Sequence, residues 1–529
     1  MSGRRVLALY GALLFCFAGV VCRLYWVCSN PAYAARAAAQ SVVTLHLPAR
    51  RGNFYDCDGQ LLTGQTTRWM ALCVPGEDSY ARLFPYTDAA GQAELYQKRS
   101  AASPFLLEVD RDVSFLGIAC WPVAQRVPDA PLAVQFLGYL DGEGHGAAGL
   151  EAAFDALLTG SGEGDTLLCT VNAQGKLRAE PVLTAADSGA VGVQLTLSRE
   201  IQQTAEAVAN ETMQSGCILV LDTATAEVRA CVSRPGYDPE NVSASLNAPD
   251  SPLLERVFQR YAVGSVFKPV LAAAALEAGE TDFTYTCPGW CEVDGQIFRC
   301  AGGVPHGEVD LAGALEKSCN GYFIRLGQLL GADAVRAMAK QLGFGQAIEL
   351  TDNMRAAAGV LPERENLASS GAYANFCFGQ GELLATPLQI AAMMNTIACG
   401  GTYHTPRLLR ATINETTGAP MTDLSRAVSR QVLTETTARA LQTLLEGVVS
   451  EGTGHDAALP TLTAAGKTGT AQTGQFSEGV ERKNYWFAGF VPAGKPRYTI
   501  VVLQDAQTEP ALSSAAIFAR VAAGLEILL

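Results

Sequence analysis

Residues 261–279 read YAVGSVFKPVLAAAALEAG and hold one lysine, Lys268, among apolar and small residues. The pattern predicts a buried helix that is opened by Gly264 and Ser265. Pro269 fits near the start of this helix because a first helical turn needs no intrahelical N–H donors. A lysine in such a helix costs free energy unless its ammonium group is paired or loses its proton. Lys268 is therefore the residue of this segment that needs an explanation.

Ser265 stands three positions before Lys268, so both side chains lie on one face of the expected helix, with Cβ atoms roughly 5–6 Å apart. Two interpretations follow from the residue types. In the first, Ser265 caps the helix while Lys268 extends its ammonium group to solvent. In the second, Ser265 is a nucleophile and Lys268 is the base that activates it.

The composition limits the class of protein. The chain has 529 residues, 49% of them hydrophobic and 8% aromatic, which predicts two or three globular domains. The formal net charge of -14 argues against a nucleic-acid partner, because no basic face would neutralise phosphates. The five histidines are scattered and form no HExxH spacing. The sequence predicts no cofactor and no metal ligand.

The N-terminus predicts a membrane anchor. MSGRR precedes an uninterrupted apolar run over 6–22, and with one arginine the run continues to 28, which reaches the roughly 20 residues needed to span a bilayer. Arg4 and Arg5 place the tail, residues 1–5, in the cytoplasm and the chain after the 6–28 anchor outside the cell. A cleaved signal peptide is the alternative, because NPAYAARAAA offers small-residue cleavage sites. The length of the run favours a single-pass anchor, since a signal core has only about 7–15 apolar residues.

The 15 cysteines are dispersed, except that Cys287, Cys291 and Cys300 share one short stretch. A disulfide between Cys287 and Cys300 is one interpretation of this group. A zinc site has little support from the sequence, because the spacing is irregular and only His306 is near. Free thiols in a reducing or anaerobic habitat are the third interpretation.

The pattern of predicted secondary structure changes near residue 191. Residues 29–190 are rich in short strands and turns. After them, VQLTLSREIQQTAEAVANETM predicts a strand and an amphipathic helix, and CILVLDTATAEVRACVSRP predicts two strands joined by a turn. Near the end, NYWFAGFVPAGKPRYTIVVLQDA predicts another pair of strands, and SSAAIFARVAAGLEILL a closing helix. Strands at both ends with helices between them predict an α+β domain whose sheet is assembled from both ends of the segment.

Three short motifs follow one another in the second part of the chain. The first is the SxxK spacing of Ser265 and Lys268, which is weak evidence alone. SxN is also common by chance, since Ser245-Leu246-Asn247 matches it. KTGT is more specific, and its glycine indicates a close backbone approach at a strand edge. The ordered set carries the hypothesis; its later members are Ser318-Cys319-Asn320 and Lys467-Thr468-Gly469-Thr470.

Taken in this order, the motifs resemble those of the serine penicillin-recognising enzymes, specifically the class B penicillin-binding proteins. Further segments resemble landmarks of that family: RGNFYDCDGQLL, GLEAAFDALLTG, SRPGYDPEN, GQGELLATPLQIA, EGTG and WFAGF. The resemblance implies an α+β protein with a membrane anchor and a strand-rich pedestal over 29–190. A transpeptidase domain over 191–529 would follow, with an antiparallel sheet packed with helices. Three features depart from the family pattern: Cys57 replaces a usual arginine, Thr196-Leu197-Ser198 replaces the family's TID, and Ala226 replaces a turn glycine.

The resemblance implies a peptidoglycan D,D-transpeptidase. Ser265 would attack the penultimate D-Ala carbonyl of a stem peptide, and Lys268 would be its base once burial and the charge of Lys467 lower its pKa. Ser318 would relay a proton to the leaving amine, and Asn320 would hold the substrate amide and Lys268. A carboxypeptidase side activity is also implied.

The same resemblance assigns Lys467, Thr468 and Thr470 to the terminal carboxylate of the substrate, with Gly469 letting the substrate lie beside the strand. Backbone N–H groups of Ser265 and Thr470 would form an oxyanion hole. β-Lactams would acylate Ser265 because they present an amide and a carboxylate in the same geometry. The alternatives are ordinary roles, with Ser318 as the cap of a helix over 321–330 and Lys467 as a solvated charge.

A membrane glycosyltransferase and a cell-wall complex are the partners that the resemblance implies. It leaves open whether the protein serves elongation, division or sporulation. Two other classes of function remain as alternatives. One is a β-lactam-hydrolysing or β-lactam-sensing protein, although no group that activates water for deacylation is visible. The other is a non-catalytic cell-wall scaffold.

Overall fold

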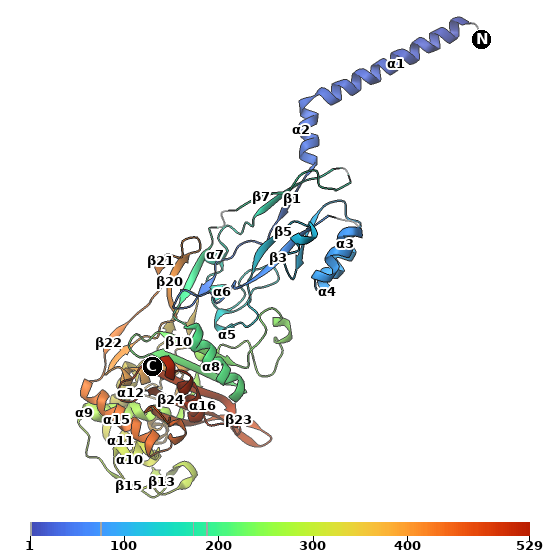
Figure 1. Ribbon diagram of the computed structural model, residues 1–529. Helices are drawn as coiled ribbons and strands as arrows, with labels where there is room; N and C mark the ends of the chain where they lie inside the picture. Colours follow the sequence, from blue (N-terminus) through green and yellow to red (C-terminus); the bar gives the residue numbers. More distant parts are fainter. Residues whose placement is uncertain (1–2, 75–76, 173, 187–188, 529) are drawn as a thin grey trace. The chain divides into compact units, whose positions relative to one another are not determined.

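The computed structural model describes residues 3–74, 77–172, 174–186 and 189–528, and these form two compact units (Figure 1). The N-terminal unit consists of Met1–Arg51, Gly64–Arg126 and Thr159–Ala190. The C-terminal unit consists of Gly52–Thr63, Val127–Leu158 and Val191–Leu529. Two segments of the predicted pedestal thus group with the C-terminal unit. The predicted domain ranges 29–190 and 191–529 stay predictions.

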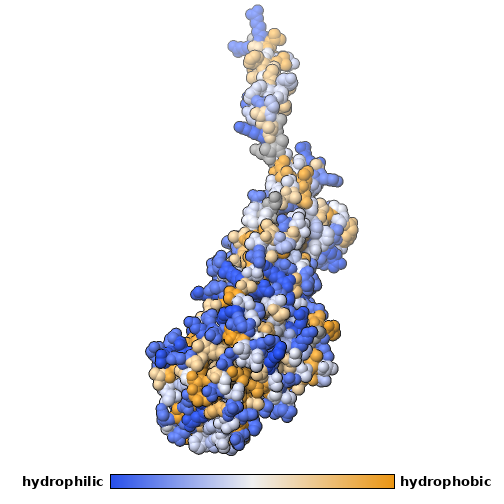
Figure 2. Space-filling model, turned by 90° about the vertical axis from the view of Figure 1, so that its left-hand side faces the viewer, coloured by the Kyte–Doolittle hydropathy of each residue, from blue (hydrophilic) through white to orange (hydrophobic). Residues whose placement is uncertain are grey.

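The chain begins with a long apolar helix, α1 (Gly3–Ser29), which α2 (Pro31–Gln40) follows. Helix α1 has 27 residues and is long and apolar enough to cross a membrane. Its large side chains are exposed, with Phe15 at 81%, and apolar residues lie along it in Figure 2. Such a helix is consistent with a membrane anchor. The predicted limits 1–5 and 6–28 stay predictions, and residues 1 and 2 lie outside the described residues.

The N-terminal unit contains two small antiparallel sheets, with strand orders β1-β6-β7 and β4-β3-β5. Its strand content agrees with the predicted strand-rich character of this part of the chain. The second sheet packs its apolar side chains, such as Leu107, against Leu83 and Leu95 of two short helices. The elements are β1 (Val42–His46), β3 (Thr66–Cys73), α3 (Glu77–Leu83), α4 (Ala89–Lys98), β4 (Phe105–Val109), β5 (Cys120–Gln125), β6 (Thr166–Thr170) and β7 (Val182–Thr184).

A five-stranded antiparallel sheet with the order β10-β9-β25-β24-β23 organises the C-terminal unit. Its first two strands come from the beginning of the segment and the other three from its end, as predicted. The predicted α+β class is confirmed. The strands are β9 (Gly216–Asp222), β10 (Val228–Arg234), β23 (Ala465–Ser477), β24 (Val480–Val491) and β25 (Tyr498–Gln507).

Both faces of this sheet are buried. Because side chains alternate across a strand, Ile218 and Val220 of β9 face one apolar core, and Cys217, Leu219 and Leu221 face the other. The first core includes residues of α8 (Arg199–Thr212) and α16 (Ser514–Gly524). The second includes residues of the helices that carry the site described below. The sheet is therefore the middle layer of the unit.

The remaining elements surround this middle layer. A second sheet has the order β2-β8-β20-β21, in which β2 and β8 are parallel, and the other pairs form two-stranded ribbons. The helices are α5 (Val134–Leu137), α6 (Gly149–Ala153), α7 (Asp155–Thr159), α9 (Lys268–Ala278), α10 (Leu311–Glu316), α11 (Asn320–Leu330), α12 (Ala332–Gln341), α13 (Ser370–Cys377), α14 (Pro387–Ala398) and α15 (Glu435–Ser450). The strands are β2 (Phe54–Tyr55), β8 (Val191–Leu195), β11 (Tyr261–Ala262), β12 (Tyr285–Cys287), β13 (Trp290–Val293), β14 (Gln296–Arg299), β15 (Gly307–Val309), β16 (Ile348–Glu349), β17 (Arg355–Ala356), β18 (Leu384–Ala385), β19 (Thr402–His404), β20 (Leu409–Asn414), β21 (Pro420–Asp423) and β22 (Ser429–Gln431).

Substitution of Phe518, a residue of α16, tests the packing on the sheet face that α8 and α16 cover. It is fully buried, and its ring centroid lies 4.7 Å from that of Phe487. We expect Phe518→Ala to destabilise the protein by about 3–5 kcal/mol, because it leaves a cavity in a packed core. Thermal unfolding of the full chain in detergent measures this effect. Ile527→Ala is the control, because Ile527 is 93% exposed. Equal melting temperatures for the two variants would contradict the prediction.

Candidate active site

The SxxK motif lies where a 3-10 turn passes into an α-helix. Ser265 is half-buried in η5 (Gly264–Phe267), and Lys268 is the first residue of α9. Pro269 follows within the first helical turn, where its missing N–H leaves no helix bond unmade. The predicted buried helix is confirmed, although its opening turn is 3-10 rather than α. The Lys268 side chain is fully buried, which contradicts the interpretation of a lysine that extends to solvent.

Backbone contacts fix this turn against the edge of the sheet. Gly264 has φ +60°, and a Cβ atom there would lie 2.5 Å from the Thr470 carbonyl oxygen of β23. Its N–H donates to the Gly379 carbonyl at 2.8 Å. Gly379 also has a positive φ, and a Cβ atom there would lie 2.0 Å from the Gly264 oxygen. Both positions therefore require glycine. The expected role of Gly379, in the GQGELLATPLQIA segment, is architectural rather than chemical, and these backbone contacts agree with it.

The Lys268 ammonium nitrogen joins the first two motifs. Lys268 Nζ donates to Ser318 O at 2.6 Å, to Ser318 Oγ at 3.0 Å and to Asn320 Oδ1 at 2.8 Å. Ser318 has φ +53°, which turns both of its oxygens toward the lysine. The Phe323 ring centroid lies 5.5 Å from Nζ. The buried charge thus has three hydrogen-bond acceptors and an aromatic face.

Burial lowers the pKa of Lys268 from 10.5 to about 7, although the charges of Cys319 and Cys300 act to raise it. Burial also lowers the pKa of Lys467 well below its usual value, and the charge of Lys268 lowers it further. The expectation named the charge of Lys467 as a cause of the Lys268 shift. In the structure, burial lowers the Lys268 pKa, and the repulsion between the lysines acts on Lys467. Lys268 can therefore exchange a proton near neutral pH.

Asn320 begins α11, and its amide is fixed at both ends. Its Nδ2 donates to the Arg299 carbonyl at 2.9 Å, which leaves Oδ1 directed at Lys268. The cap of α11 is Cys319, whose Sγ accepts from the Tyr322 N–H at 3.5 Å. The alternative in which Ser318 caps this helix is therefore wrong.

The KTGT motif lies on β23, where its side chains alternate. Lys467 and Gly469 point into the protein, whereas Thr468 is half-buried and Thr470 is exposed. Lys467 Nζ donates to the carbonyl and the hydroxyl of Thr468 at 3.3 and 3.4 Å. Because Lys467 is fully buried, it is not a solvated charge at a strand end. The Thr468 hydroxyl lies 3.0 Å from that of Thr453, a residue of the EGTG segment that the sequence analysis did not assign to the site.

Gly469 is where β23 meets the turn that carries Ser265. A Cβ atom at Gly469 would lie 2.9 Å from Val266 Cγ1 and 3.0 Å from the Val263 oxygen. The missing side chain thus allows the serine-bearing turn to pack on the strand. The expectation that Gly469 makes room for a substrate remains a prediction, and the structure supplies this additional reason for glycine.

Strand β23 is an edge strand, with β24 on one side only. The Thr470 carbonyl accepts from Gln380 Nε2 at 3.3 Å, so it points away from β24. In an antiparallel strand the N–H of a residue points to the same side as its carbonyl, so the Thr470 N–H also faces the open edge. Gln380 is a further residue that the sequence analysis left without a role. An extended ligand could add to this edge as another strand.

The arrangement provides the parts of a nucleophilic site. Within the described parts of the chain, Ser265 Oγ makes no hydrogen bond, so it is not committed to a structural role. A base with a pKa near neutral follows it by one helical turn. A serine, a lysine of this kind and backbone N–H groups at a strand edge can carry out acyl transfer.

Two groups of side chains in the described residues could hold a metal ion. The first, Asp56, Cys57 and Asp58, lies in a turn whose Asp56 carboxylate accepts from three backbone N–H groups. Those bonds give this group a structural role. The second group is Cys287, Cys300, His306 and Cys319, and it is described in a later subsection.

Comparison with known proteins identifies the family that the chain resembles. Residues 216–523 match the model of the penicillin-binding protein transpeptidase domain. The chain is 30% identical over 383 residues to stage V sporulation protein D of Bacillus subtilis, which covers 70% of this chain and 58% of that protein. It is 32% identical over 435 residues to penicillin-binding protein PbpB of Mycolicibacterium smegmatis, which covers 76% of this chain and 64% of that protein. In both cases the match spans less than two thirds of the relative.

Solved structures give the same result. Penicillin-binding protein 3 of Mycobacterium tuberculosis, complexed with aztreonam, is 26% identical with a TM-score of 0.67, over 92% of this chain and 97% of that one. A chain of a peptidoglycan synthase complex that coordinates polymerization and crosslinking is 26% identical with a TM-score of 0.73. That match covers 99% of this chain and 98% of the other.

Gly469→Ala tests the contact between the serine-bearing turn and the strand. We expect the new methyl group to displace the turn and to lower the stability by about 1–3 kcal/mol. If Ser265 is the residue that reacts, labelling by a fluorescent penicillin should slow at least about tenfold, because a displaced reacting group loses rate steeply. Gly494→Ala is the control, because a Cβ atom there meets nothing within 4 Å. Similar melting temperatures and labelling rates in both variants would contradict this role of Gly469.

Proposed function

The chain belongs to the penicillin-binding protein transpeptidase family, and we propose that it is a membrane-anchored peptidoglycan D,D-transpeptidase that works through a serine acyl-enzyme and is inhibited by β-lactams. One observation carries the proposal. Lys268 Nζ, buried with a pKa near 7, joins Ser318 and Asn320 of the second motif, one turn after Ser265. An inactive scaffold would not need a buried lysine in this setting.

Acylation begins with the hydroxyl of Ser265. Neutral Lys268 takes its proton while Oγ attacks the carbonyl carbon of the penultimate D-Ala of a stem peptide. The carbonyl oxygen becomes an oxyanion, which the N–H groups of Ser265 and Thr470 stabilise. One such donor is typically worth about 2.7–4 kcal/mol. The open edge of β23 supports this placement, because the Thr470 N–H points to it.

The second half of acylation needs a proton on the leaving amine. Once it has taken the serine proton, Lys268 is an ammonium whose three N–H groups match Ser318 O, Ser318 Oγ and Asn320 Oδ1. After Lys268 takes the serine proton, the Ser318 hydroxyl can pass a proton to the departing nitrogen and recover one from Lys268. The C–N bond then breaks, and the terminal D-Ala leaves as the free amino acid.

The terminal carboxylate of the donor peptide fits the KTGT strand. Thr468 and Thr470 present hydroxyl groups on the outer face of β23, and Thr453 adds a hydroxyl beside Thr468. Lys467 lies beneath them, where its positive form would attract an anion. Binding of the carboxylate would favour the charged form of Lys467, which burial disfavours in the free protein.

Deacylation transfers the acyl group to an acceptor. The amine of a second stem peptide attacks the ester carbon, Lys268 takes its proton, and Ser265 Oγ leaves as the hydroxyl. The product is an amide cross-link between two stems. Water in place of the amine would release the trimmed peptide, which is the carboxypeptidase side activity.

The partners follow from the reaction. Cross-linking requires glycan strands that another enzyme polymerises, and the similar chain of a peptidoglycan synthase complex supports a membrane glycosyltransferase as a partner in a cell-wall complex. Stem peptides lie outside the cytoplasm. We therefore place the chain that follows α1 on the extracellular side, with α1 as a single-pass anchor and Arg4 and Arg5, at the start of α1, on the cytoplasmic side.

Labelling of the full chain in detergent by a fluorescent penicillin tests the nucleophile. We expect a long-lived adduct in the wild type and none in Ser265→Ala, because the substitution removes the hydroxyl that would form the ester with the penicillin. Ser318→Ala should label at least about 100-fold more slowly, as expected for loss of a proton-transfer group. Ser245→Ala, in the chance match to SxN, should label like the wild type.

Cross-linking by the same proteins separates the functions. Supplied with uncross-linked glycan strands that bear pentapeptide stems, the wild type should form dimeric stems and release D-Ala, and Ser265→Ala should do neither. Rapid loss of the penicillin adduct would instead favour a β-lactam-hydrolysing protein. Dimer formation that survives Ser265→Ala would contradict the proposal.

The pKa of Lys268 predicts a pH dependence. The reaction needs the neutral amine, and the pKa is about 7, so the acylation rate should rise with pH and reach half of its maximum near pH 7. Below that point it should fall about tenfold per pH unit. Penicillin labelling rates between about pH 5 and pH 9 measure this, with thermal unfolding at each pH as the control for stability. A rate that is constant or decreases with pH in this range would exclude Lys268 as the base.

A further inference from the structure

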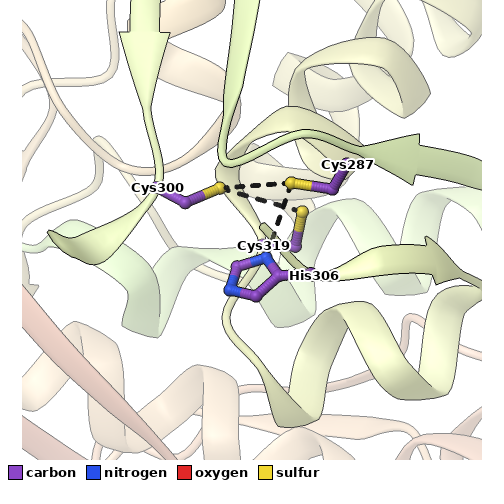
Figure 3. Close-up of side chains that lie close together, drawn as sticks. All are labelled: Cys287, Cys300, His306 and Cys319. Atoms are coloured by element: carbon purple, nitrogen blue, oxygen red, sulfur yellow. Dashed lines mark hydrogen bonds between the residues drawn. The ribbon is translucent and has the colours of Figure 1, made fainter. Parts of the chain in front are cut away.

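Four chemically reactive side chains lie together, and one of them, Cys319, belongs to the second motif (Figure 3). Cys287 ends β12, Cys300 follows β14, His306 precedes β15, and Cys319 caps α11. Their ligand atoms all lie within 4.8 Å of one another. Three separate chain segments thus direct three thiols and one imidazole at a common point.

The distances between these atoms match a tetrahedral metal site. Cys287 Sγ lies 3.7 Å from Cys300 Sγ, and Cys300 Sγ lies 3.9 Å from Cys319 Sγ. Cys287 Sγ lies 3.6 Å from His306 Nδ1. A tetrahedral zinc ion with Zn–S bonds of about 2.3 Å and a Zn–N bond of about 2.05 Å places its sulfur ligands about 3.8 Å apart, and sulfur and nitrogen about 3.6 Å apart.

Backbone N–H groups point at two of the three sulfur atoms. The Gly289 N–H donates to Cys287 Sγ at 3.4 Å, and the Tyr322 N–H donates to Cys319 Sγ at 3.5 Å. The N-terminus of α11 adds its positive dipole end to the same place. Backbone donors to sulfur are the usual outer support of a thiolate site.

We propose that Cys287, Cys300, His306 and Cys319 bind one Zn²⁺ ion in a closed, structural Cys₃His site. All four positions of a tetrahedral zinc ion are filled by protein atoms, so the ion has no open position for catalysis. Binding releases to solvent the protons of those thiols that are still protonated, and it involves no redox step. A Cys287–Cys300 disulfide would use only two of the four side chains and would leave Cys319 and His306 without a shared partner.

The ion would also act on the proposed active site. Cys319 lies between Ser318 and Asn320, and Cys300 follows Arg299, whose carbonyl holds the Asn320 amide. Zinc would therefore hold the β14–β15 loop against the start of α11 and keep the acceptors of Ser318 and Asn320 within reach of Lys268. This effect of zinc on the active site rests on the proposed function, whereas the metal site itself does not. In the proposed mechanism, Cys319 is a positioning residue.

The metal content of the full chain tests the site without reference to activity. The protein is purified in detergent with a non-chelating reductant, supplied with Zn²⁺, desalted and measured by elemental analysis. We expect about one Zn²⁺ per chain. Replacement by Co²⁺ should give the visible absorption of tetrahedral cobalt together with thiolate-to-metal charge-transfer bands. A zinc content near zero in the folded wild type would overturn the proposal, as would Co²⁺ spectra without charge transfer.

Variants identify the ligands. Cys300→Ser and His306→Ala should bind Zn²⁺ at least about tenfold more weakly in competition with a chromogenic chelator. Cys291→Ser is the matched control, since Cys291 is a buried cysteine of the neighbouring β13 that does not belong to the four, and it should retain the ion. Wild-type affinity in both ligand variants would overturn the assignment. A Cys287–Cys300 disulfide in protein purified under anaerobic conditions would overturn it as well.

Penicillin labelling then reports on the positioning role separately. Removal of zinc from the wild type should slow labelling at least about tenfold, and added Zn²⁺ should restore the rate, while Ser265→Ala with zinc bound should stay unlabelled. Zinc binding with an unchanged labelling rate after removal would leave the site intact and would overturn the positioning role. Failure of the proposed function would appear instead as a wild type that binds zinc and does not label.

Discussion

The burial of one ammonium group constrains the whole site. Lys268 Nζ can lie in the core only because Ser318 and Asn320 supply three acceptors for it, so α9 and α11 must meet with their N-terminal ends together. The same burial brings the pKa of the lysine near neutral, which a charge at the surface would not achieve. The contact that holds the two helices together is thus the contact that makes the lysine a usable base.

The five-stranded sheet brings the KTGT motif of β23 close to Ser265 and Lys268. Strand β23 comes from a segment about 200 residues after Ser265, yet the antiparallel order β10-β9-β25-β24-β23 sets it at the edge beside η5. Gly264, Gly379 and Gly469 remove the Cβ atoms that would keep backbone from backbone there. The edge keeps free N–H and C=O groups for a ligand because the serine-bearing turn occupies only part of it.

Local residue patterns and the order of the motifs were enough to predict several features of the fold and the site. The sheet built from both ends, the buried helix after Ser265 and the order of the three motifs could all be derived from residue types and spacing. The 3-10 opening of that helix and the cap of α11 could not, because they depend on how Gly264 and Cys319 pack against distant segments. Thr453 was missed, and the partners of Gly379 and Gln380 could not be predicted, since these contacts with Thr468, Gly264 and Thr470 join positions far apart in the chain. The cysteines at 287, 300 and 319 showed no regular spacing because loops, not a single helix or hairpin, bring them together.

The conformation of Ser318 explains why so many contacts gather on this segment. A serine at φ +53° is strained by roughly 1–2 kcal/mol, and such a conformation persists only where its surroundings overdetermine it. On one side, Lys268 binds both oxygens of Ser318. On the other side, Cys319 is anchored among the thiols and by the Tyr322 N–H. If Lys268 exchanges a proton as proposed, its hydrogen bonds to Ser318 change during the reaction, whereas the contacts of Cys319 do not. The proposed mechanism therefore needs the cysteine side as the constant part of the support for Ser318.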